Sequence, residues 1–327
     1  MLVIGIDGGG TKTMATLMDE DGHILGIGIA GASGINSVPL HVARNKIFDA
    51  VEDAFKSAKM AVCNVDAIFA GIGGLLTSED RVVINHILSV LPCYSTGCII
   101  HADNDVNNAL AGGLAGRNGI AVIASTQSSA FGTNFKHQHH RCGGYGFKEG
   151  DAGSAYALGR AALKLATRAF DGRVKESPLT KELLEFLNLN HSADVYAMMD
   201  KYYDDRLLTS ELAPYITKYA NLNDIHALDI VNENTDELAM CLYGVINALE
   251  YDNKEIAIVG TLANANGVYN RQLIDKLQAI APDFKIINWE LIPVVGAALI
   301  ALKLNKIILN DTIIKNAKET YKNFKLS

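Results

Sequence analysis

The sequence predicts an α/β protein built from two similar halves. Apolar segments of strand length alternate with segments of helical spacing from residue 2 to residue 114, in the order β-β-β-α-β-α-β-α. A similar order begins again after the turn at residues 116–119, with three strand-like segments followed by a helix. The chain of 327 residues also exceeds one comfortable hydrophobic core, so we expect two domains.

The first half is expected to alternate between strands and helices. We place strands at residues 2–7, 14–18, 22–29, 65–72 and 97–102. Residues 40–59 keep apolar side chains at helical spacing, and residues 78–91 and 105–114 are the other expected helices. Ser78 is the expected N-cap of the helix at 78–91, because Glu79 and Asp80 follow it in the first turn.

The second half has expected strands at residues 120–124, 129–135, 141–147, 255–260 and 284–287. Helices are expected at 153–170, at 265–280 and from Pro293 to residue 301, with the proline in the first turn. Residues 178–249 are mostly helical and form an insertion, and the amphipathic segment 311–324 is expected to return to the first domain. The predicted domains are residues 1–116 with about 308–327, and residues 117–307 with the helical insertion at about 178–249.

Composition and charge restrict the classes of partner. Apolar residues make up 49% and charged residues 20% of the chain, as in ordinary globular proteins. The net charge of −7 argues against a nucleic-acid or anionic-membrane surface. No segment approaches the roughly 20 apolar residues of a membrane span, and the five cysteines form no CxxC pair. We therefore expect a cytoplasmic protein that binds small molecules, without nucleic-acid or membrane partners.

The glycine-rich segment near the N-terminus is the strongest functional signal. An apolar strand ends at Asp7, three glycines follow, and Thr11, Lys12 and Thr13 lead into a second strand. Glycines bring backbone N–H groups close to an anion, while the hydroxyls and the lysine add donors and positive charge. No helix follows, so the segment is neither a P-loop nor a dinucleotide fingerprint. We interpret it as a phosphate-binding hairpin, with Asp7 placed to hold Mg²⁺ through water.

Further polar or glycine-rich segments follow other expected strands. They are Ser33-Gly34-Ile35-Asn36-Ser37, Asn104-Asp105, Ser125-Thr126-Gln127-Ser128, Gly143-Gly144-Tyr145-Gly146, Gly150-Asp151-Ala152-Gly153-Ser154-Ala155-Tyr156 and Gly260-Thr261. Some of them also have an ordinary structural explanation when taken alone. Residues 33–37 have the composition of a turn, Asp103 or Asn104 suits an N-cap, and Asp151 suits the first turn of a helix.

Together with the hairpin, these segments resemble the superfamily of sugar kinases, actin and heat-shock chaperones. Within it, the chain resembles the N-acetylglucosamine kinases and the broader BadF/BadG ATPase family, over essentially its full length. The resemblance implies an α/β fold of two ribonuclease-H-like (actin-like ATPase) domains that flank a cleft, with a helical insertion in the second. It also implies a homodimer that uses ATP and Mg²⁺ to phosphorylate the 6-hydroxyl of N-acetylglucosamine or a closely related amino sugar.

The resemblance implies a role for each matching residue. Asp105 is the implied general base on the sugar hydroxyl, although Asp103 is only two residues away. The implied contacts to ATP are Asp7 (through Mg²⁺), Gly9, Gly10, Thr11, Lys12, Thr13, Thr126, Ser128 and Gly260. The implied contacts to the sugar are Asn36, Thr126, Gly143, Gly144, Tyr145 and Asp151.

The chain departs from the family pattern in the second phosphate motif. Ser125-Thr126-Gln127-Ser128 stands where the family has Gly-Thr-Gly-Ser, so both glycines are replaced. Side chains then stand where phosphate oxygens are expected, although Thr126 and Ser128 remain as donors. In addition, Ala152 replaces the family's glutamate, and Gly260-Thr261 keeps one of the two glycines that many members have.

These departures leave other functions open at this stage. The substrate could be glucosamine or N-acetylmuramic acid instead. The chain could be a non-catalytic sugar sensor with a degenerate ATP site, or an ATPase that activates a dehydratase, although its cysteines lack the obvious arrangement for a bridging cluster. The segment from His137 to Cys142 has potential zinc ligands, but we interpret it as a polar hairpin tip.

Overall fold

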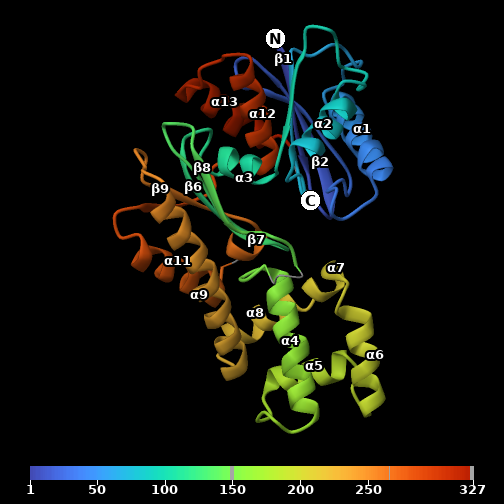
Figure 1. Ribbon diagram of the computed structural model, residues 1–327, viewed down its shortest axis with the longest axis vertical. Coiled ribbons are helices and arrows are strands. Elements are labelled where there is room, and N and C mark those ends of the chain that lie inside the picture. Colours follow the sequence, from blue (N-terminus) through green and yellow to red (C-terminus); the bar gives the residue numbers. More distant parts are fainter. Residues whose placement is uncertain (148–150, 265, 325–327) are drawn as a thin grey trace. The chain divides into compact units, whose positions relative to one another are not determined.

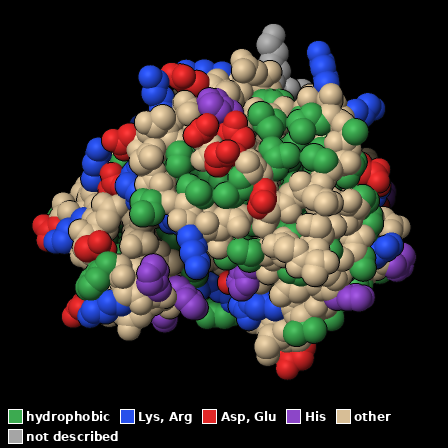
Figure 2. Space-filling view, turned by 90° about the horizontal axis from the view of Figure 1, so that it is seen from above, with side chains coloured by type: hydrophobic (Ala, Val, Ile, Leu, Met, Phe, Trp, Pro, Cys, Tyr) green, Lys and Arg blue, Asp and Glu red, His purple; other side chains and the backbone are tan. Residues whose placement is uncertain are grey.

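The computed structural model describes residues 1–147, 151–264 and 266–324 (Figure 1). The chain divides into two compact units, Met1–Asn118 with Trp289–Ser327, and Gly119–Asn288. Among the described residues, no helix is long and apolar enough to cross a membrane. In the space-filling view of Figure 2, hydrophobic side chains gather in the upper part of the visible face beside a group of acidic ones, and basic side chains lie mainly toward its edges.

The first unit is built on a five-stranded mixed sheet. Its strands are β1 (Leu2–Gly8), β2 (Lys12–Asp19), β3 (Ile24–Gly31), β4 (Ala67–Ile72) and β5 (Ile99–Asp103), in the order β3-β2-β1-β4-β5. The first three strands pair antiparallel, whereas β4 pairs parallel with both β1 and β5. This arrangement places the tip of the β1–β2 hairpin beside the carboxyl end of β4.

Helices cover both faces of this sheet, which explains why β1 is apolar along its length. They are α1 (Leu40–Ser57), α2 (Ser78–Leu88), α3 (Val106–Gly113), α12 (Pro293–Leu304) and α13 (Asp311–Tyr321). Ile4 and Ile6 of β1 are buried in one cluster with Val51 of α1. Val3 lies in a second cluster, with Val295 of α12. Thr77, rather than the predicted Ser78, is the N-cap of α2, because its side chain accepts from the backbone of Asp80.

The position of α12 differs from the predicted domain limits, which placed residues 293–307 in the second domain. The helix packs on β1 and β4 of the first unit. Val295 and Leu299 share a buried cluster there with Val3 and Phe69. The sequence of a helix that is apolar on all sides indicates that the helix is buried, but it does not indicate against which sheet it packs.

The second unit repeats the strand order of the first. Its strands are β6 (Gly119–Ala124), β7 (Ser128–Thr133), β8 (His139–Gly143), β9 (Glu255–Val259) and β10 (Lys285–Asn288), in the order β10-β9-β6-β7-β8. β6, β7 and β8 pair antiparallel, and β9 pairs parallel with β6 and β10, as in the first sheet. The prediction of two halves with one topology is therefore confirmed.

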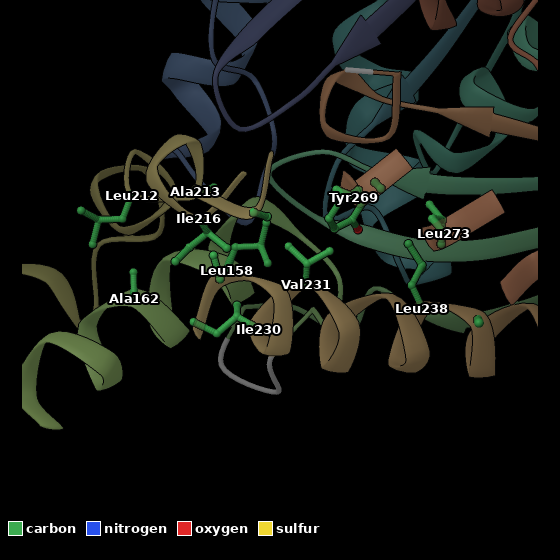
Figure 3. Close-up of a cluster of buried hydrophobic side chains, with 14 of the residues drawn as sticks. Leu158, Ala162, Leu212, Ala213, Ile216, Ile230, Val231, Leu238, Tyr269 and Leu273 are labelled. Carbon is green, nitrogen blue, oxygen red and sulfur yellow. The ribbon is translucent and has the colours of Figure 1, made fainter. Parts of the chain in front are cut away.

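Helices fill the rest of the second unit. They are α4 (Ala155–Phe170), α5 (Pro178–Phe186), α6 (Ser192–Tyr202), α7 (Arg206–Ser210), α8 (Ala213–Asn221), α9 (Ile225–Ala248), α10 (Thr261–Asn264) and α11 (Val268–Ile280). Figure 3 shows their shared core, in which Leu158 of α4, Ile216 of α8 and Val231 of α9 are all buried. The segment that was predicted to be a helical insertion thus packs into the same core as α4.

Candidate active site

The glycine-rich hairpin of the first unit has the open tip that phosphate binding requires. Residues 9–11 connect β1 to β2, and the N–H of Gly9 donates to the carbonyl of Lys12 at 2.9 Å. The carbonyl of Gly9 accepts from the N–H groups of Ser33, at 3.1 Å, and Gly34, at 2.9 Å. The side chains of Thr11 and Lys12 are exposed. The loop after β3 therefore holds the hairpin tip in place and leaves its two polar side chains accessible.

Thr13, which was expected to contact phosphate, is fully buried. Its hydroxyl lies 2.6 Å from the carbonyl oxygen of Gly31 and 2.7 Å from Oγ of Ser33. In this structure the side chain of Thr13 therefore ties β2 to the loop after β3.

We expect Thr13→Val to destabilise the first unit by about 1–3 kcal/mol, because it leaves buried polar groups without a partner. Thr16→Val is the matched control on the same strand. The hydroxyl of Thr16 is also fully buried but has no hydrogen-bond partner among the described residues, so its loss should be neutral or stabilising. Urea unfolding followed by the fluorescence of Trp289, the single tryptophan, reports on this unit. Equal losses in the two variants would contradict the role of Thr13.

Asp7, the last residue but one of β1, is a partly buried carboxylate. Its Oδ1 accepts a hydrogen bond of 2.6 Å from Nδ2 of Asn108. Burial raises the pKa of Asp7 to about 7, and the negative charge of Asp105 adds to this effect. The hydrogen bond from Asn108 and the charge of Lys12 oppose it. A carboxylate in this condition is stabilised by a nearby cation.

Asn108 is a site residue that the sequence analysis missed. It lies on α3, is fully buried, and its Nδ2 also lies 3.2 Å from the carbonyl oxygens of Ile6 and Gly71. It therefore joins β1, β4 and α3 at Asp7. The available signal was an asparagine immediately before the apolar run Ala109-Leu110-Ala111, because a buried amide must find partners.

The structure separates the roles of the two candidate bases. Oδ1 of Asp103 accepts hydrogen bonds from Arg81, at 2.8 Å to Nη2, and from the backbone N–H of Asn104, at 2.8 Å. Asp105 occupies the N-cap position of α3, but its side chain makes no capping hydrogen bond. A Cβ placed on Gly73 would lie 3.2 Å from Oδ2 of Asp105, so this carboxylate is adjacent to Gly73. The carboxylate of Asp103 therefore forms an ion pair with Arg81, whereas the carboxylate of Asp105 lies beside Gly73 and does not cap α3.

Asn36 lies next to Gly74, the residue that follows Gly73. A Cβ on Gly74 would come within 2.7 Å of Asn36, and the backbone of Ile35 donates to the carbonyl of Gly73 at 2.9 Å. The side chain of Asn36 is exposed. Gly73 in turn donates to the carbonyl of Gly8 at 2.7 Å. The first unit therefore brings the hairpin, Asp105 and Asn36 together around the end of β4.

The unusual turn of the second unit forms a hairpin without left-handed backbone. Ala124 of β6 pairs with Ser128 of β7, so residues 125–127 form the tip. None of residues 125–128 has a positive φ. The carbonyl of Ser125 accepts from Ala155 at 2.8 Å, and the buried hydroxyl of Ser128 donates to the carbonyl of Ala152 at 2.6 Å. Replacing the family's glycines has not strained the turn, and Thr126 remains partly exposed.

Because no glycine is needed there, the double variant Ser125→Gly with Gln127→Gly should not relieve strain. We expect it to destabilise the second unit by about 1 kcal/mol through added freedom of the unfolded chain. Thermal unfolding of the variant and the parent protein measures the difference. A clear gain in stability would show that the parent turn is strained after all.

Asp151 braces the loop expected to contact the sugar. It is buried, has φ of 36°, and its Oδ1 accepts from the N–H of Gly146 at 3.2 Å. The N-cap of α4 is Ser154, whose side chain accepts from Ala157, so Asp151 is not the capping acid. Tyr145 is 66% exposed, and the guanidinium of Arg141 lies 5.1 Å from its ring centroid. Gly150 of the predicted motif lies outside the described residues.

Two glycines of this unit lie so close to neighbouring residues that a side chain there would be crowded. A Cβ on Gly144 would lie 3.0 Å from Cβ of Ser129, and one on Gly260 would lie 2.2 Å from the carbonyl oxygen of Ala124. Gly260 also has φ of 115°, which side chains disfavour. Gly260 is therefore required at the end of β9, whether or not it contacts a nucleotide. Gly143, the other predicted sugar contact, is the last residue of β8.

The described residues contain no group of three or more His, Cys, Asp and Glu side chains that could hold a metal ion. His139, His140 and Cys142 belong to β8, not to the hairpin tip as predicted. The carboxylates near the hairpin are instead Asp7, whose charged form is destabilised by burial, and Asp105, whose charge acts on Asp7. This fits Mg²⁺, which usually keeps several waters and takes its other ligands from substrate phosphates.

Two five-stranded sheets of the same topology form the actin-like α/β fold that was expected. The chain belongs to the BadF/BadG/BcrA/BcrD ATPase family, whose sequence profile matches residues 4–301.

Two curated kinases and one solved structure are similar to the chain over more than 90% of its length. The chain is 29% identical over 306 residues to the N-acetylmuramic acid/N-acetylglucosamine kinase of Clostridium acetobutylicum, covering 91% of this chain and 97% of the relative. It is 28% identical over 324 residues to the N-acetyl-D-glucosamine kinase of Dictyostelium discoideum, covering 93% and 99%. A crystal structure of a candidate N-acetylglucosamine kinase from Chromobacterium violaceum superposes with a TM-score of 0.73 at 24% identity, covering 92% and 98%. The predicted actin-like α/β fold is thus confirmed.

Proposed function

We propose that this protein is an ATP-dependent kinase that phosphorylates the 6-hydroxyl of N-acetylglucosamine or a closely related amino sugar. The observation that carries the proposal is the position of Asp105, whose carboxylate lies beside Gly73, close to the phosphate hairpin and to Asn36, whereas Asp103 pairs with Arg81. A general base must be able to reach the hydroxyl that it deprotonates. The names of the two curated relatives support the amino sugar as substrate.

In the proposed reaction, a carboxylate oxygen of Asp105 accepts the proton of the sugar hydroxyl. The hydroxyl oxygen bonds to the γ-phosphorus of ATP, the bond from that phosphorus to the β–γ bridging oxygen breaks, and ADP leaves. The backbone N–H of Gly10, with Thr11 and Lys12, stabilises the charge on the phosphates, while Gly9 shapes the loop, because its N–H donates to the carbonyl of Lys12. Mg²⁺, when bound, neutralises phosphate charge, and Asp7 holds it through water.

The remaining predicted residues bind and orient the substrates. Asn36 contacts the acetamido group, while Gly143, Gly144, Tyr145 and Asp151 line the sugar. For the nucleotide, Thr126 and Gly260 supply the contacts in the second unit, and Thr126 also approaches the sugar. The hydroxyl of Ser128, also expected to contact the nucleotide, is buried and donates to the carbonyl of Ala152, so we assign it no contact. The unstrained turn at 125–128 supports retention of ATP binding over a degenerate site. We further propose that the protein is cytoplasmic and forms a homodimer. Light scattering of the purified chain measures its molar mass and so tests the dimer.

A coupled ADP-release assay tests the proposed function. Purified protein with Mg·ATP is given N-acetylglucosamine, glucosamine, N-acetylmuramic acid, N-acetylmannosamine or glucose. We expect ADP release that depends on N-acetylglucosamine or another amino sugar on the panel. Sugar binding without release with any of them would identify a sensor, and sugar-independent ADP release would favour an ATPase that acts on another protein.

A further inference from the structure

Two loops of the second unit carry proposed substrate contacts. The sugar loop comprises residues 143–146, and the phosphate turn comprises residues 125–128. A third segment, the connecting turn at residues 151–154, lies between the sugar loop and α4 in the chain. All three segments belong to the second unit.

The connecting turn is hydrogen-bonded to both loops. Toward the sugar loop, Oδ1 of Asp151 accepts from the N–H of Gly146 at 3.2 Å. Toward the phosphate turn, the carbonyl of Ala152 accepts from the buried hydroxyl of Ser128 at 2.6 Å. A shift of the connecting turn would therefore displace or release polar groups of both loops.

Two helices hold the connecting turn at Gly153. The hydroxyl of Tyr269, on α11, donates to the carbonyl of Gly153. Oδ1 of Asn234, on α9, accepts from the N–H of Gly153 at 3.3 Å. Nδ2 of Asn234 donates to the carbonyl of Ile230 at 2.8 Å, which orients this side chain. Both backbone polar groups of Gly153 are therefore bonded to side chains from these helices.

The surroundings of this contact are tightly packed. Gly153 has φ of 83°, and a Cβ there would lie 2.8 Å from Cβ of Leu238, so the turn fits closely against α9. Tyr269 is 3% exposed and belongs to the buried cluster that also contains Leu238 (Figure 3). Burial raises the pKa of Tyr269, so its hydroxyl keeps its proton and remains a donor. The buried ring therefore fixes the position of the Gly153 carbonyl.

We propose that Tyr269 is a positioning residue for both the sugar loop and the phosphate turn, and that it acts through Gly153 without touching either substrate. This inference rests on the proposed function, which assigns substrate contacts to both loops. Tyr269→Phe removes one hydroxyl and leaves a buried carbonyl without its donor. The connecting turn then shifts, and both loops lose the geometry in which they bind. The proposed base, Asp105, belongs to the first unit and keeps its surroundings.

Steady-state kinetics of the full chain with Mg·ATP and N-acetylglucosamine tests this role. For Tyr269→Phe we expect KM for the sugar and KM for ATP each to rise by about ten-fold, and kcat to stay within about three-fold of the parent. A variant that is merely less folded gives the opposite result, because a smaller folded fraction lowers the apparent kcat and leaves both KM values unchanged. Asn234→Ala removes the other side-chain bond to Gly153 and should raise the same two KM values, so the test does not depend on the folding of one variant.

Tyr251→Phe is the matched control in the same unit. The hydroxyl of Tyr251 donates to the carbonyl of Val245 on α9 at 3.2 Å, so this variant also removes a tyrosine hydroxyl that bonds to a backbone carbonyl, but not one of the connecting turn. We expect both of its KM values to stay within about two-fold of the parent.

Three results would overturn the positioning role of Tyr269. They are parent KM values in both Tyr269→Phe and Asn234→Ala, a fall in kcat alone, and an equal rise of KM in Tyr251→Phe. A parent protein that releases no ADP with any sugar contradicts the proposed function instead. Calorimetric Kd values for N-acetylglucosamine then replace KM in the same comparison, and a parent that binds no sugar would overturn both proposals.

Discussion

Asp105→Asn is expected to lower kcat by about 10²–10⁴-fold, because an amide cannot accept the proton of the sugar hydroxyl in the transition state. Binding of N-acetylglucosamine should change little, since the substitution keeps the size of the side chain and Asp105 does not cap α3. Steady-state kinetics with Mg·ATP gives kcat, and calorimetric titration with the sugar gives Kd.

Asp103→Asn is the matched control, two residues away. Asp103 pairs with Arg81 and accepts from the backbone of Asn104, so its replacement should affect stability more than chemistry. Because Asp103 is not the proposed base, we expect its replacement to lower kcat by less than about 10²-fold, below the range of a general base. A larger loss of kcat for Asp103→Asn than for Asp105→Asn would show that Asp103, not Asp105, is the general base.

Asp7→Asn is expected to make the protein more stable and less active. The pKa of Asp7 is raised to about 7 in the folded protein by burial, whereas a free aspartate titrates near 3.9. Between these values the folded state binds the proton and the unfolded state does not. The free energy of unfolding of the parent therefore falls as pH rises from about 4 to about 7 and stays low above that.

The uncharged side chain in Asp7→Asn does not cause this fall in the free energy of unfolding, and it can still accept the hydrogen bond from Asn108. We expect Asp7→Asn to be more stable than the parent by roughly 2–4 kcal/mol at pH 8, and by less than about 1 kcal/mol at pH 4.5. Urea unfolding followed through Trp289 measures both. Asp21→Asn removes an exposed carboxylate from the same unit and serves as the control. A gain that is equal at both pH values would show that burial of the charge is not its cause.

The same variant should lose activity if Asp7 holds Mg²⁺ through water. Outer-sphere partners of a metal typically contribute about 10–100-fold to affinity or activity. We expect kcat/KM to fall by about that factor and the Mg²⁺ concentration for half-maximal rate to rise. An unchanged dependence on Mg²⁺ would separate Asp7 from the metal. A stability gain joined to an activity loss is the usual signature of a group kept for function.

The sequence predicted the elements better than their partners. Strand and helix periods, with the restart after residue 119, were enough for the repeated topology, because each strand carries its own apolar pattern. The position of α12 could not be predicted, since an all-round apolar helix packs equally well on either sheet. The buried role of Thr13 depends on a contact with Ser33, 20 residues away. Asn108 depends on a longer-range contact, with Asp7.

The turn at residues 125–128 illustrates a second limit. Sequence comparison with the family pattern treats the loss of two glycines as damage, because glycine is the residue that tolerates left-handed backbone. The structure closes the turn without such backbone, so the substitution changes which groups face a phosphate without straining the hairpin. Which groups these are depends on side-chain direction, which a motif does not encode.

The most direct test of the proposed function is identification of the product. Purified protein is incubated with Mg·ATP and N-acetylglucosamine, and phosphorus–proton correlation NMR locates the new phosphate. We predict N-acetylglucosamine 6-phosphate and ADP in equal amounts, with the phosphate coupled to the protons on carbon 6. A phosphate on another carbon, or ADP with free phosphate and unchanged sugar, would contradict the proposal that Asp105 activates the 6-hydroxyl.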